Sequence, residues 1–388
     1  MRNPKPERRG LPRRDFLAAG ACGACALGLA GFLGSARSAR AQAFQTAQKG
    51  LIKARRSPWF TELDNGHVRC DLCPRLCRIA PGRRGPCRVR ENRGGQGYSL
   101  VYGNPCLLQL DPVERKPFFH VLPGTRALSV STAGCNIQCK FCEVWDMALV
   151  GPEEVHSYDV PPDEVITQAR DVRARSISYA FGEPVIFYEY MDAIATRAKE
   201  AGLMNLLHTN GYIAAEPLRA LCDRLDAVNI DLKGFDPAFY RDVCGGELEP
   251  VLDTLRRLKA EGVHIEITNI VIPTLNDDLK KIRAMCRWLF NELGPDVPVH
   301  FGRFYPLYKL ANLPPTPVRT LDNARDAAME EGLRYVYVAR VTGHEGENTF
   351  CPGCRKPVIE RMGFVVEAMH LSDGHCAHCG AAVPGRWG

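Results

Sequence analysis

Hydrophobic positions follow two alternating patterns between about residues 128 and 341. Short runs rich in β-branched residues, typical of buried strands, alternate with stretches whose apolar residues recur every three or four positions, as in amphipathic helices. The predicted strands are 128–131, 176–181, 205–208, 227–232, 264–272, 299–305 and 335–341, and the predicted helices are 162–174, 185–201, 217–225, 251–260, 279–291 and 321–331. This alternation predicts an α/β fold with right-handed crossovers, a sheet curled into a partial (β/α)6 barrel, and function at the carboxyl ends of the strands.

The chain on either side of this region has a different composition. We expect residues 42–66 to form a linker with a short helix, and residues 67–126, rich in Cys, Arg, Gly and Pro, to form a loop-rich module. Two Cys-x2-Cys pairs near the C-terminus flank a predicted hairpin at 358–370. The predicted divisions are therefore a signal peptide (1–41), a linker with an N-terminal Cys-rich module (42–126), the barrel (127–342) and a C-terminal ribbon-like module (343–388).

The N-terminus has the pattern of an export signal. Residues 2–14 are basic, residues 16–34 are apolar and small, and Ala39-Arg40-Ala41 has the form of a signal-peptidase site. Arg13 and Arg14 stand directly before the apolar run, which indicates the twin-arginine pathway. We expect a periplasmic protein cleaved after Ala41. An uncleaved apolar run would instead give a periplasm-facing membrane anchor, and a cytoplasmic location is the remaining alternative.

The formal net charge of +6 is confined to this signal. Residues 1–41 carry eight basic and two acidic side chains, so the rest of the chain is neutral. A neutral mature chain offers no electrostatic basis for binding nucleic acid, and we expect no such partner.

Seventeen cysteines are distributed unevenly, and eleven of them fall into three closely spaced groups. These are the N-terminal cysteine set (Cys70, Cys73, Cys77 and Cys87), the central cysteine triad (Cys135, Cys139 and Cys142) and the C-terminal cysteine set (Cys351, Cys354, Cys376 and Cys379). Cysteines this close in sequence share a metal more readily than they pair as disulfides. Cys106, Cys222, Cys244 and Cys286 have no metal spacing, and we expect Cys222 and Cys286 to pack as small apolar residues in helices.

The central cysteine triad directly follows the first predicted barrel strand, with the spacing C-x3-C-x2-C. A [4Fe–4S] cluster normally takes four cysteine ligands, so three thiolates leave one iron open to a ligand from outside the protein. A zinc loop completed by a distant residue is the alternative.

The other two cysteine sets each provide four thiolates. The N-terminal cysteine set spans eighteen residues and can wrap a zinc ion or an auxiliary iron–sulfur cluster, and zinc is slightly favoured. The C-terminal cysteine set has the arrangement of a zinc ribbon, with disulfides as the alternative.

The stretch from Thr132 to Cys142 closely resembles the motif of radical S-adenosylmethionine (SAM) enzymes. The resemblance implies that SAM binds the open iron through its amino and carboxylate groups and is cleaved reductively to a 5′-deoxyadenosyl radical. The turn at 181–184 resembles the Gly-Gly-Glu-Pro turn that receives the SAM ammonium in such enzymes, with Phe181 in place of the first glycine. The segments at 208–211 and 229–234 resemble those of glycyl-radical activases such as the pyruvate formate-lyase activating enzymes. Carried over to this chain, the SAM contacts are Phe141, Gly182, Glu183, Asn210, Asp231, Lys233 and, where activases have a histidine, Tyr305.

From about His67 to Trp387 the chain resembles the radical SAM enzymes of the AmmeMemoRadiSam system, on its three cysteine groups and the segments at 111–117 and 343–349. The resemblance implies an activase-like oxidoreductase that needs an electron donor and abstracts hydrogen from an unknown substrate, a protein or a small molecule. The candidates for substrate contacts are Glu114, Lys116, His120, His344 and Glu345. The alternative is an exported metal-binding or electron-carrying protein without SAM chemistry, for which the polar residues Glu183, Asp231 and Lys233 would have no use.

Overall fold

The computed structural model describes residues 46–388. The predicted signal peptide, residues 1–41, lies outside the described residues. Between residues 46 and 388, no helix is both long enough and apolar enough to cross a membrane.

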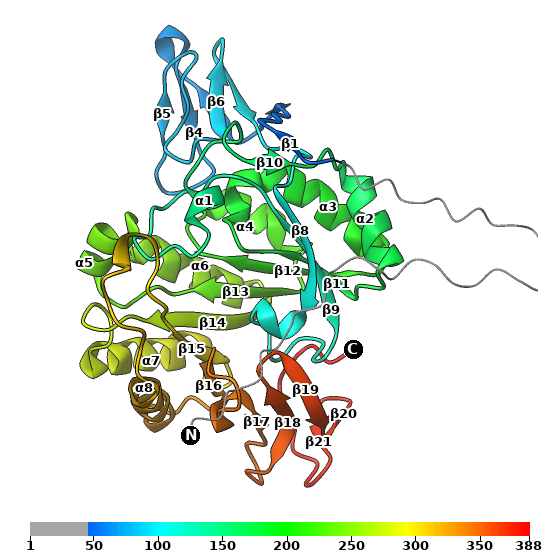
Figure 1. Ribbon diagram of the computed structural model, residues 1–388, viewed down its shortest axis with the longest axis vertical. Coiled ribbons are helices and arrows are strands. Elements are labelled where there is room, and N and C mark those ends of the chain that lie inside the picture. Colours follow the sequence, from blue (N-terminus) through cyan, green and yellow to red (C-terminus); the bar gives the residue numbers. More distant parts are fainter. Residues whose placement is uncertain (1–45) are drawn as a thin grey trace, which may run out of the picture. The chain divides into compact units, whose positions relative to one another are not determined.

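An eight-stranded sheet with the order β16-β15-β14-β13-β12-β11-β9-β8 forms the centre of the fold (Figure 1). Its parallel strands are β9 (Arg126–Ser131), β11 (Ser176–Tyr179), β12 (Met204–Thr209), β13 (Ala227–Asp231), β14 (His264–Val271), β15 (Val299–Arg303) and β16 (Val336–Ala339). All seven predicted strands are therefore present. They follow one another across the sheet in chain order, as successive crossovers of one hand require.

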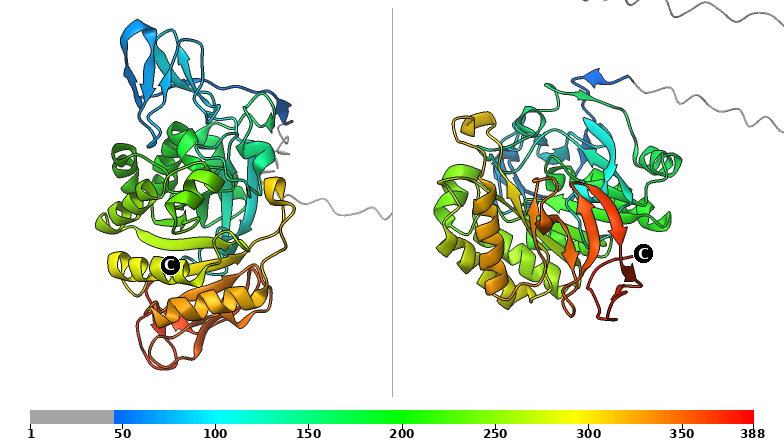
Figure 2. Two further views of the ribbon diagram at one scale, coloured as in Figure 1. Left: turned by 90° about the vertical axis from the view of Figure 1, so that its left-hand side faces the viewer. Right: turned by 60° about the horizontal axis from the view of Figure 1, so that its bottom comes forward.

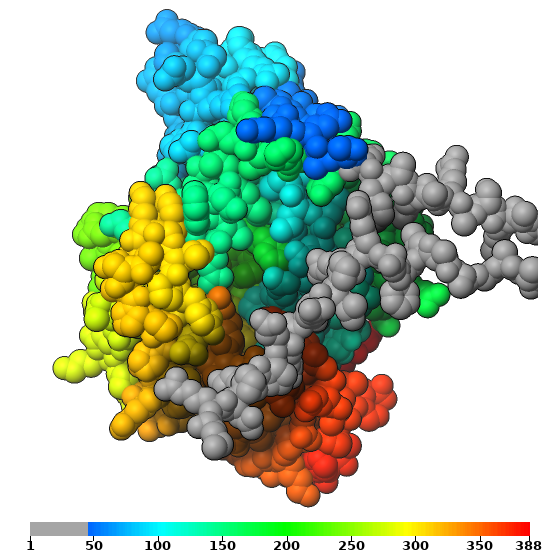
Figure 3. Space-filling model, viewed as in Figure 1, coloured from blue at the N-terminus to red at the C-terminus, as the bar shows by residue number. Residues whose placement is uncertain are grey.

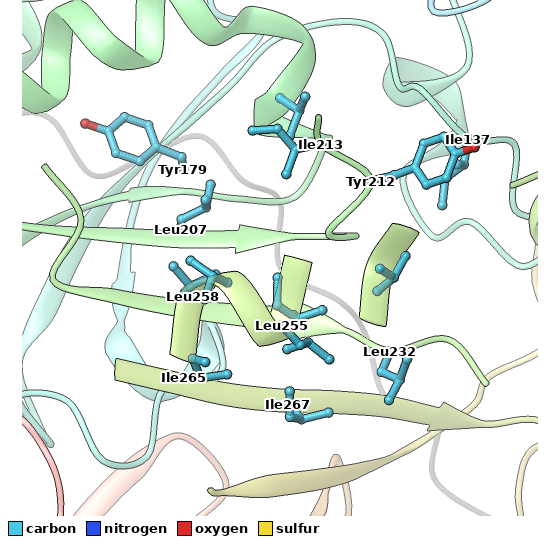
Figure 4. Close-up of a cluster of buried hydrophobic side chains, with 14 of the residues drawn as sticks. Ile137, Tyr179, Leu207, Tyr212, Ile213, Leu232, Leu255, Leu258, Ile265 and Ile267 are labelled. Atoms are coloured by element: carbon cyan, nitrogen blue, oxygen red, sulfur yellow. The ribbon is translucent and has the colours of Figure 1, made fainter. Parts of the chain in front are cut away.

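The six predicted helices are also present, and they join these strands. They are α2 (Pro162–Asp171), α3 (Tyr188–Glu200), α4 (Ala215–Cys222), α6 (Glu249–Ala260), α7 (Leu279–Leu293) and α8 (Val318–Glu330). Figure 4 shows how one of them packs: Leu255 and Leu258 of α6 lie beside Ile265 and Ile267 of β14. Each fully buried leucine contributes about 1.5–3 kcal/mol of hydrophobic free energy, so this apolar face fixes the helix on the sheet.

Residues 46–99 cover most of the expected linker with a short helix (42–66) and the start of the expected loop-rich module (67–126), and they differ from both expectations. Within this segment the structure has short strands, in the sheets β3-β4-β5 and β2-β7-β6, and a single 3-10 turn at Asp64–Gly66. The strands are β2 (Arg55–Arg56), β3 (Phe60–Glu62), β4 (Val68–Cys70), β5 (Arg78–Ile79), β6 (Arg90–Arg93) and β7 (Gln96–Ser99), and β1 (Gln48–Lys49) pairs with β10 (His156–Ser157). The ring of Phe60 fills the space above Gly97. Packing between β3 and β7 therefore outweighs any local helical preference.

Strand β8 (Leu107–Pro112) lies in the segment that we expected to be loop-rich, yet it pairs along its whole length with β9, antiparallel. The central sheet thus continues across the boundary predicted at residue 126. Residues 113–117 follow β8 directly, so this pairing places them at the edge of the parallel sheet.

The C-terminal part forms a three-stranded sheet at the β16 end of the central sheet (Figures 1 and 2). It consists of β17 (Thr349–Phe350), β18 (Pro357–Met362) and β19 (Val365–Met369), and its β18–β19 hairpin coincides with the hairpin predicted at 358–370. The fully buried guanidinium of Arg361 donates to the carbonyl oxygens of Phe119 and Glu347. This side chain ties the hairpin to the connection between β8 and β9.

A buried carboxylate fixes the same connection from the other side. Glu266 of β14 accepts hydrogen bonds from the backbone amides of Phe119 and His120, and His300 of β15 lies 2.7 Å away. Burial raises the pKa of Glu266, but its contacts with His264 and His300 outweigh this effect and hold the pKa well below its usual value. The folded structure therefore stabilises the charged form of Glu266.

Candidate active site

A cavity of about 590 Å³ opens at the carboxyl ends of the parallel strands. Figure 3 shows the surface hollowed between the yellow segment and the green and teal surface beside it. The cavity is lined by the whole central cysteine triad and by all seven residues predicted to contact SAM, which are Phe141, Gly182, Glu183, Asn210, Asp231, Lys233 and Tyr305. The structure thus brings together residues that are up to 170 positions apart in the chain.

Successive strand ends supply these residues. Cys135 comes soon after β9, Glu183 after β11 and Asn210 directly after β12, while Asp231 is the last residue of β13. Because parallel strands all end at the same edge of a sheet, side chains that follow them converge there. Residues from β14, β15 and β16 complete the wall, among them Thr268, Gly302 and Ala339.

The loop that carries the central cysteine triad is held by backbone contacts on two sides. Gly134 has a φ of +101°, and a Cβ at this position would lie 2.7 Å from the carbonyl oxygen of Cys87. Only glycine fits such a conformation and such a close approach. On the other side, the amides of Gln138 and Lys140 donate to the carbonyl oxygens of Cys244 and Val243, at 2.8 and 2.9 Å.

Three thiols on one wall of a roomy cavity are a suitable donor set for an iron–sulfur cluster. Thiolates are the ligands that such clusters take, and the three of them reach the cavity from one short loop. The residues present therefore fit a [4Fe–4S] cluster, for which Cys135, Cys139 and Cys142 would supply three ligands.

Glu183 links two strand ends to this loop. Its carboxylate accepts hydrogen bonds from the Thr209 hydroxyl (2.6 Å) and from the amides of Asn210 (2.9 Å) and Val185 (3.0 Å). Asn210 in turn donates through Nδ2 to Oδ1 of Asn136, next to Cys135 in the loop. Burial raises the pKa of Glu183, while the hydrogen bonds from Thr209 and Asn210 oppose the shift.

The turn before Glu183 shows how the chain accommodates Phe181 in place of the expected glycine. Phe181 adopts a φ of +71°, a conformation that is strained for a residue with a side chain. Its ring receives the Lys116 ammonium 3.9 Å from the ring centre. At the next position a side chain would not fit, because a Cβ on Gly182 would lie 2.7 Å from the Ser131 hydroxyl oxygen.

Asp231, Lys233 and His208 form a group of charged and polar side chains in the cavity wall. Lys233 Nζ lies 2.7 Å from one carboxylate oxygen of Asp231, and His208 Nε2 lies 3.0 Å from the other. Burial raises the pKa of Asp231, but its contacts with the Lys233 ammonium and with His208 outweigh this effect and hold the pKa below the usual range. The site therefore keeps a fixed carboxylate, and Phe141 lies 5.8 Å from the Lys233 ammonium.

Tyr305 lies at the rim of the cavity. Its side chain is 42% exposed, and its hydroxyl donates to the carbonyl oxygen of Arg340 at 3.2 Å. Arg303 and Arg340 pack on its ring. The phenol is thus oriented by residues of the last two strands and their loops.

Two of the five candidate substrate contacts line the cavity, Glu114 and Lys116. Lys116 is fully buried and 2.5 Å from Asp111, and burial lowers its pKa to about 8 against the opposing effect of Asp111. The structure does not place the other three candidates in the cavity wall. His120 is buried between the Pro384 carbonyl and the Tyr337 hydroxyl, His344 pairs with Asp322, and Glu345 is exposed.

Two residues in or next to this site, Glu347 and Cys244, were not predicted from the sequence. Glu347 lines the cavity and accepts hydrogen bonds from the amides of Gly343 and Gly363. Cys244, which has no metal spacing, lies next to Cys139, and burial raises the pKa of the Cys244 thiol well above its usual value. Only the placement of Glu347 within the segment 343–349 could have pointed to it.

The fifteen cysteines within residues 46–388 are all free thiols. In the C-terminal cysteine set, Sγ of Cys351 lies 3.5 Å from that of Cys379, and Sγ of Cys354 lies 3.8 Å from that of Cys376. All four sulfurs lie within 4.8 Å of one another, as ligands of a single metal ion would. The N-terminal cysteine set surrounds a small cavity of its own.

Comparison with known proteins gives relatives of two kinds. The uncharacterized protein MJ0808 of Methanocaldococcus jannaschii is 42% identical over 331 residues, which cover 85% of this chain and 98% of that protein. The pyruvate formate-lyase-activating enzyme of Clostridium pasteurianum is 25% identical over 173 residues, which cover 44% of this chain and 71% of the enzyme. A solved domain of the corresponding enzyme from Bacteroides vulgatus shares 18% identity, covers 42% of this chain and 98% of that domain, and has a TM-score of 0.38.

Residues 129–286 match the radical SAM superfamily, and this stretch contains the central cysteine triad together with Glu183, Asn210, Asp231 and Lys233. Such a match does not favour a carrier protein without SAM chemistry. Residues 129–286 therefore form a radical SAM domain, the type found in enzymes that combine a [4Fe–4S] cluster with S-adenosylmethionine to carry out radical chemistry.

Proposed function

We propose that this protein cleaves SAM reductively and uses the resulting radical to abstract hydrogen from a substrate bound in the same cavity. The observation that carries the proposal is the cavity wall, which combines three thiols, a complete set of predicted SAM contacts and two segments from outside the SAM site. The central cysteine triad would hold a [4Fe–4S] cluster, which when reduced would supply the electron that breaks the sulfonium C–S bond of SAM, giving methionine and a 5′-deoxyadenosyl radical.

The chain's own residues position the reactants and keep water out. Glu183 fixes Asn210 beside Cys135, and the Asp231 carboxylate offers a fixed negative charge to polar or cationic groups of SAM. Phe141 offers an aromatic face near these groups. Apolar side chains such as Ile137 and Phe119 cover much of the remaining wall, which suits an intermediate that must be protected from side reactions.

The part of the cavity wall formed by residues 114–117 and Glu347, which we call the substrate end, supports the assignment to the AmmeMemoRadiSam group. Residues 114–117, which follow β8, and Glu347, which lies in the segment 343–349, line the same cavity although more than 220 positions separate them. Both segments are those on which the resemblance to that group rests. We propose that Lys116 and Glu347 face an activase-like substrate, a protein or a small molecule.

We expect that Cys139→Ala will lower the amount of 5′-deoxyadenosine formed from SAM to the level seen without protein, because the cluster loses one of its three ligands. The measurement is chromatography of anaerobically reconstituted protein after reduction with dithionite. Cys286→Ala is the matched control, since Cys286 is buried in α7 outside every cysteine group, and it should retain wild-type yield. Equal yields from wild type and Cys139→Ala would contradict the proposal.

We further propose that the C-terminal cysteine set binds one structural zinc ion. A tetrahedral site with Zn–S bonds of about 2.3 Å places its sulfurs about 3.8 Å apart, close to the two separations of 3.5 and 3.8 Å. The backbone amides of Gly353 and His378 donate to Cys351 and Cys376, which favours thiolates at these positions.

Replacing Cys376 by Ser should release this zinc and lower the melting temperature by at least about 5 °C, because zinc binding contributes directly to folding. Zinc analysis and calorimetry measure both effects, and SAM binding should persist in the folded fraction. His378→Ala, which removes an exposed neighbouring ring, should change neither quantity. Full zinc content and an unchanged melting temperature in Cys376→Ser would refute the zinc site.

We also propose that the protein is exported by the twin-arginine pathway. The pathway carries folded proteins, so the cysteine groups can be loaded in the reducing cytoplasm before they reach an oxidising compartment. An unfolded chain with seventeen cysteines would be exposed to disulfide formation there.

The double variant Arg13→Lys, Arg14→Lys should remain uncleaved in the cytoplasm, whereas wild type should be found in the periplasm or at the membrane, cleaved after Ala41. Cell fractionation with immunoblotting measures this distribution. The variant Arg8→Lys, Arg9→Lys alters two other arginines of the basic stretch and should be exported normally. Uncleaved wild-type protein in the soluble cytoplasm would rule out the export signal.

A further inference from the structure

We propose that the N-terminal cysteine set binds a second iron–sulfur cluster, of the [4Fe–4S] type, which passes electrons to the cluster on the central cysteine triad. The electron-transfer step depends on the proposed function, whereas the identity of the metal site does not. The arrangement of the sulfurs, a buried arginine and the contacts between the two cysteine loops all support this site.

The spacing of the sulfurs distinguishes the N-terminal cysteine set from the C-terminal cysteine set, for which we propose zinc. Within residues 46–388, only the C-terminal cysteine set has three or more ligand atoms all within 4.8 Å of one another. Cys70, Cys73, Cys77 and Cys87 instead surround a cavity of about 20 Å³. A cluster of several irons keeps its thiolates farther apart than a single ion does. Among the described residues, the sulfurs of the central cysteine triad likewise do not all lie within 4.8 Å of one another, so one molecule contains both arrangements.

Arg90 supplies a hydrogen-bond donor for this small cavity. Its side chain is 2% exposed and lines the cavity together with all four cysteines. Nη1 binds the Glu189 carboxylate at 2.7 and 2.9 Å and Nη2 binds the Ser57 hydroxyl, but the buried Nε has no hydrogen-bond partner. An unsatisfied buried donor is costly, and the sulfurs of an iron–sulfur cluster would accept its proton. Such hydrogen bonds are also a means of setting a cluster's potential.

Direct contacts connect the two cysteine loops. Gly134, one residue before Cys135, lies against the carbonyl oxygen of Cys87. Arg75, between Cys73 and Cys77, donates through Nε to the carbonyl oxygen of Asn136 at 2.5 Å. Asn136 lines the small cavity, and Asn210, bound to its side chain, lies 3.8 Å from the sulfur of Cys135. A continuous path of bonds and hydrogen bonds therefore joins the two sites.

The electron balance of the proposed step is simple. A low-potential one-electron carrier protein is oxidised as it reduces the second cluster from the 2+ to the 1+ state. The second cluster returns to 2+ when it reduces the cluster on the central cysteine triad, which then delivers the same electron to SAM. No proton is moved, and zinc could not take part because it has no redox chemistry.

Metal analysis of a variant without the central cysteine triad tests the identity of the site. The triple variant of Cys135, Cys139 and Cys142 to Ala, reconstituted anaerobically, should retain about four irons and equivalent sulfide, half of the wild-type content. Its reduced form should give an electron paramagnetic resonance (EPR) signal that SAM does not change. A triple variant without iron but with a second zinc ion would overturn the proposal. Failure of the proposed function would look different, because iron content would then be equal in wild type and triple variant.

The potential of the remaining cluster tests the role of Arg90 as a positioning residue. In the triple variant, Arg90→Lys keeps the positive charge and removes the Nε donor, so the midpoint potential should become more negative, because a lost hydrogen bond destabilises the reduced cluster. Arg78→Lys, on the exposed side of β5, is the matched control and should leave the potential unchanged. An identical potential in both variants would show that Arg90 does not bind the cluster.

Electron transfer is tested with the central cysteine triad intact. Cys73→Ser should abolish SAM cleavage driven by reduced flavodoxin, a one-electron carrier protein used as probe. Cleavage driven by dithionite should continue, because a small reductant can reach the cavity directly, and this activity also reports that the variant is folded. Flavodoxin-driven cleavage at the wild-type rate in a variant that lacks the second cluster would overturn the electron-transfer role.

Discussion

The buried carboxylate of Glu183 is the interaction on which the geometry of the active site depends. It satisfies a hydroxyl and two backbone amides at the ends of β11 and β12, and through Asn210 it reaches Asn136 in the cysteine loop. A hydrogen bond to a charged group contributes about 1.5–3 kcal/mol, and losing one leaves a charge unsatisfied in the interior. The hydrogen bonds of Glu183 therefore fix the position of Cys135 relative to the strand ends.

A second constraint acts at the far end of the cavity. Glu266 holds the amides of Phe119 and His120, and Arg361 binds the Phe119 carbonyl from the C-terminal hairpin. The segment that carries Glu114 and Lys116 is thereby attached both to the sheet and to the C-terminal sheet. The substrate end of the cavity is built from parts of the chain that buried charges bring together, while the SAM end is built from successive strands.

Much of the fold could be predicted from the sequence, because the parallel strands and their helices carry local apolar patterns. Strand β8 and the strands before residue 100 could not be, since their formation depends on pairing and packing with distant segments, such as β9 for β8 and Gly97 for Phe60. The central cysteine triad and the predicted SAM contacts reached the cavity, whereas the substrate candidates His120, His344 and Glu345 did not. Glu347 and Cys244 were missed. Their roles come from contacts across the fold, which no local spacing reveals.

The central claim is that the cluster on the central cysteine triad has an iron that SAM binds directly. EPR spectroscopy of the reduced protein with and without SAM tests this most directly, because a ligand on an iron changes the signal of that cluster. The account predicts that saturating SAM shifts the spectrum of the wild-type protein and that replacing the central cysteine triad abolishes the shift. A reduced wild-type protein with a full complement of iron and a spectrum unchanged by SAM would contradict it.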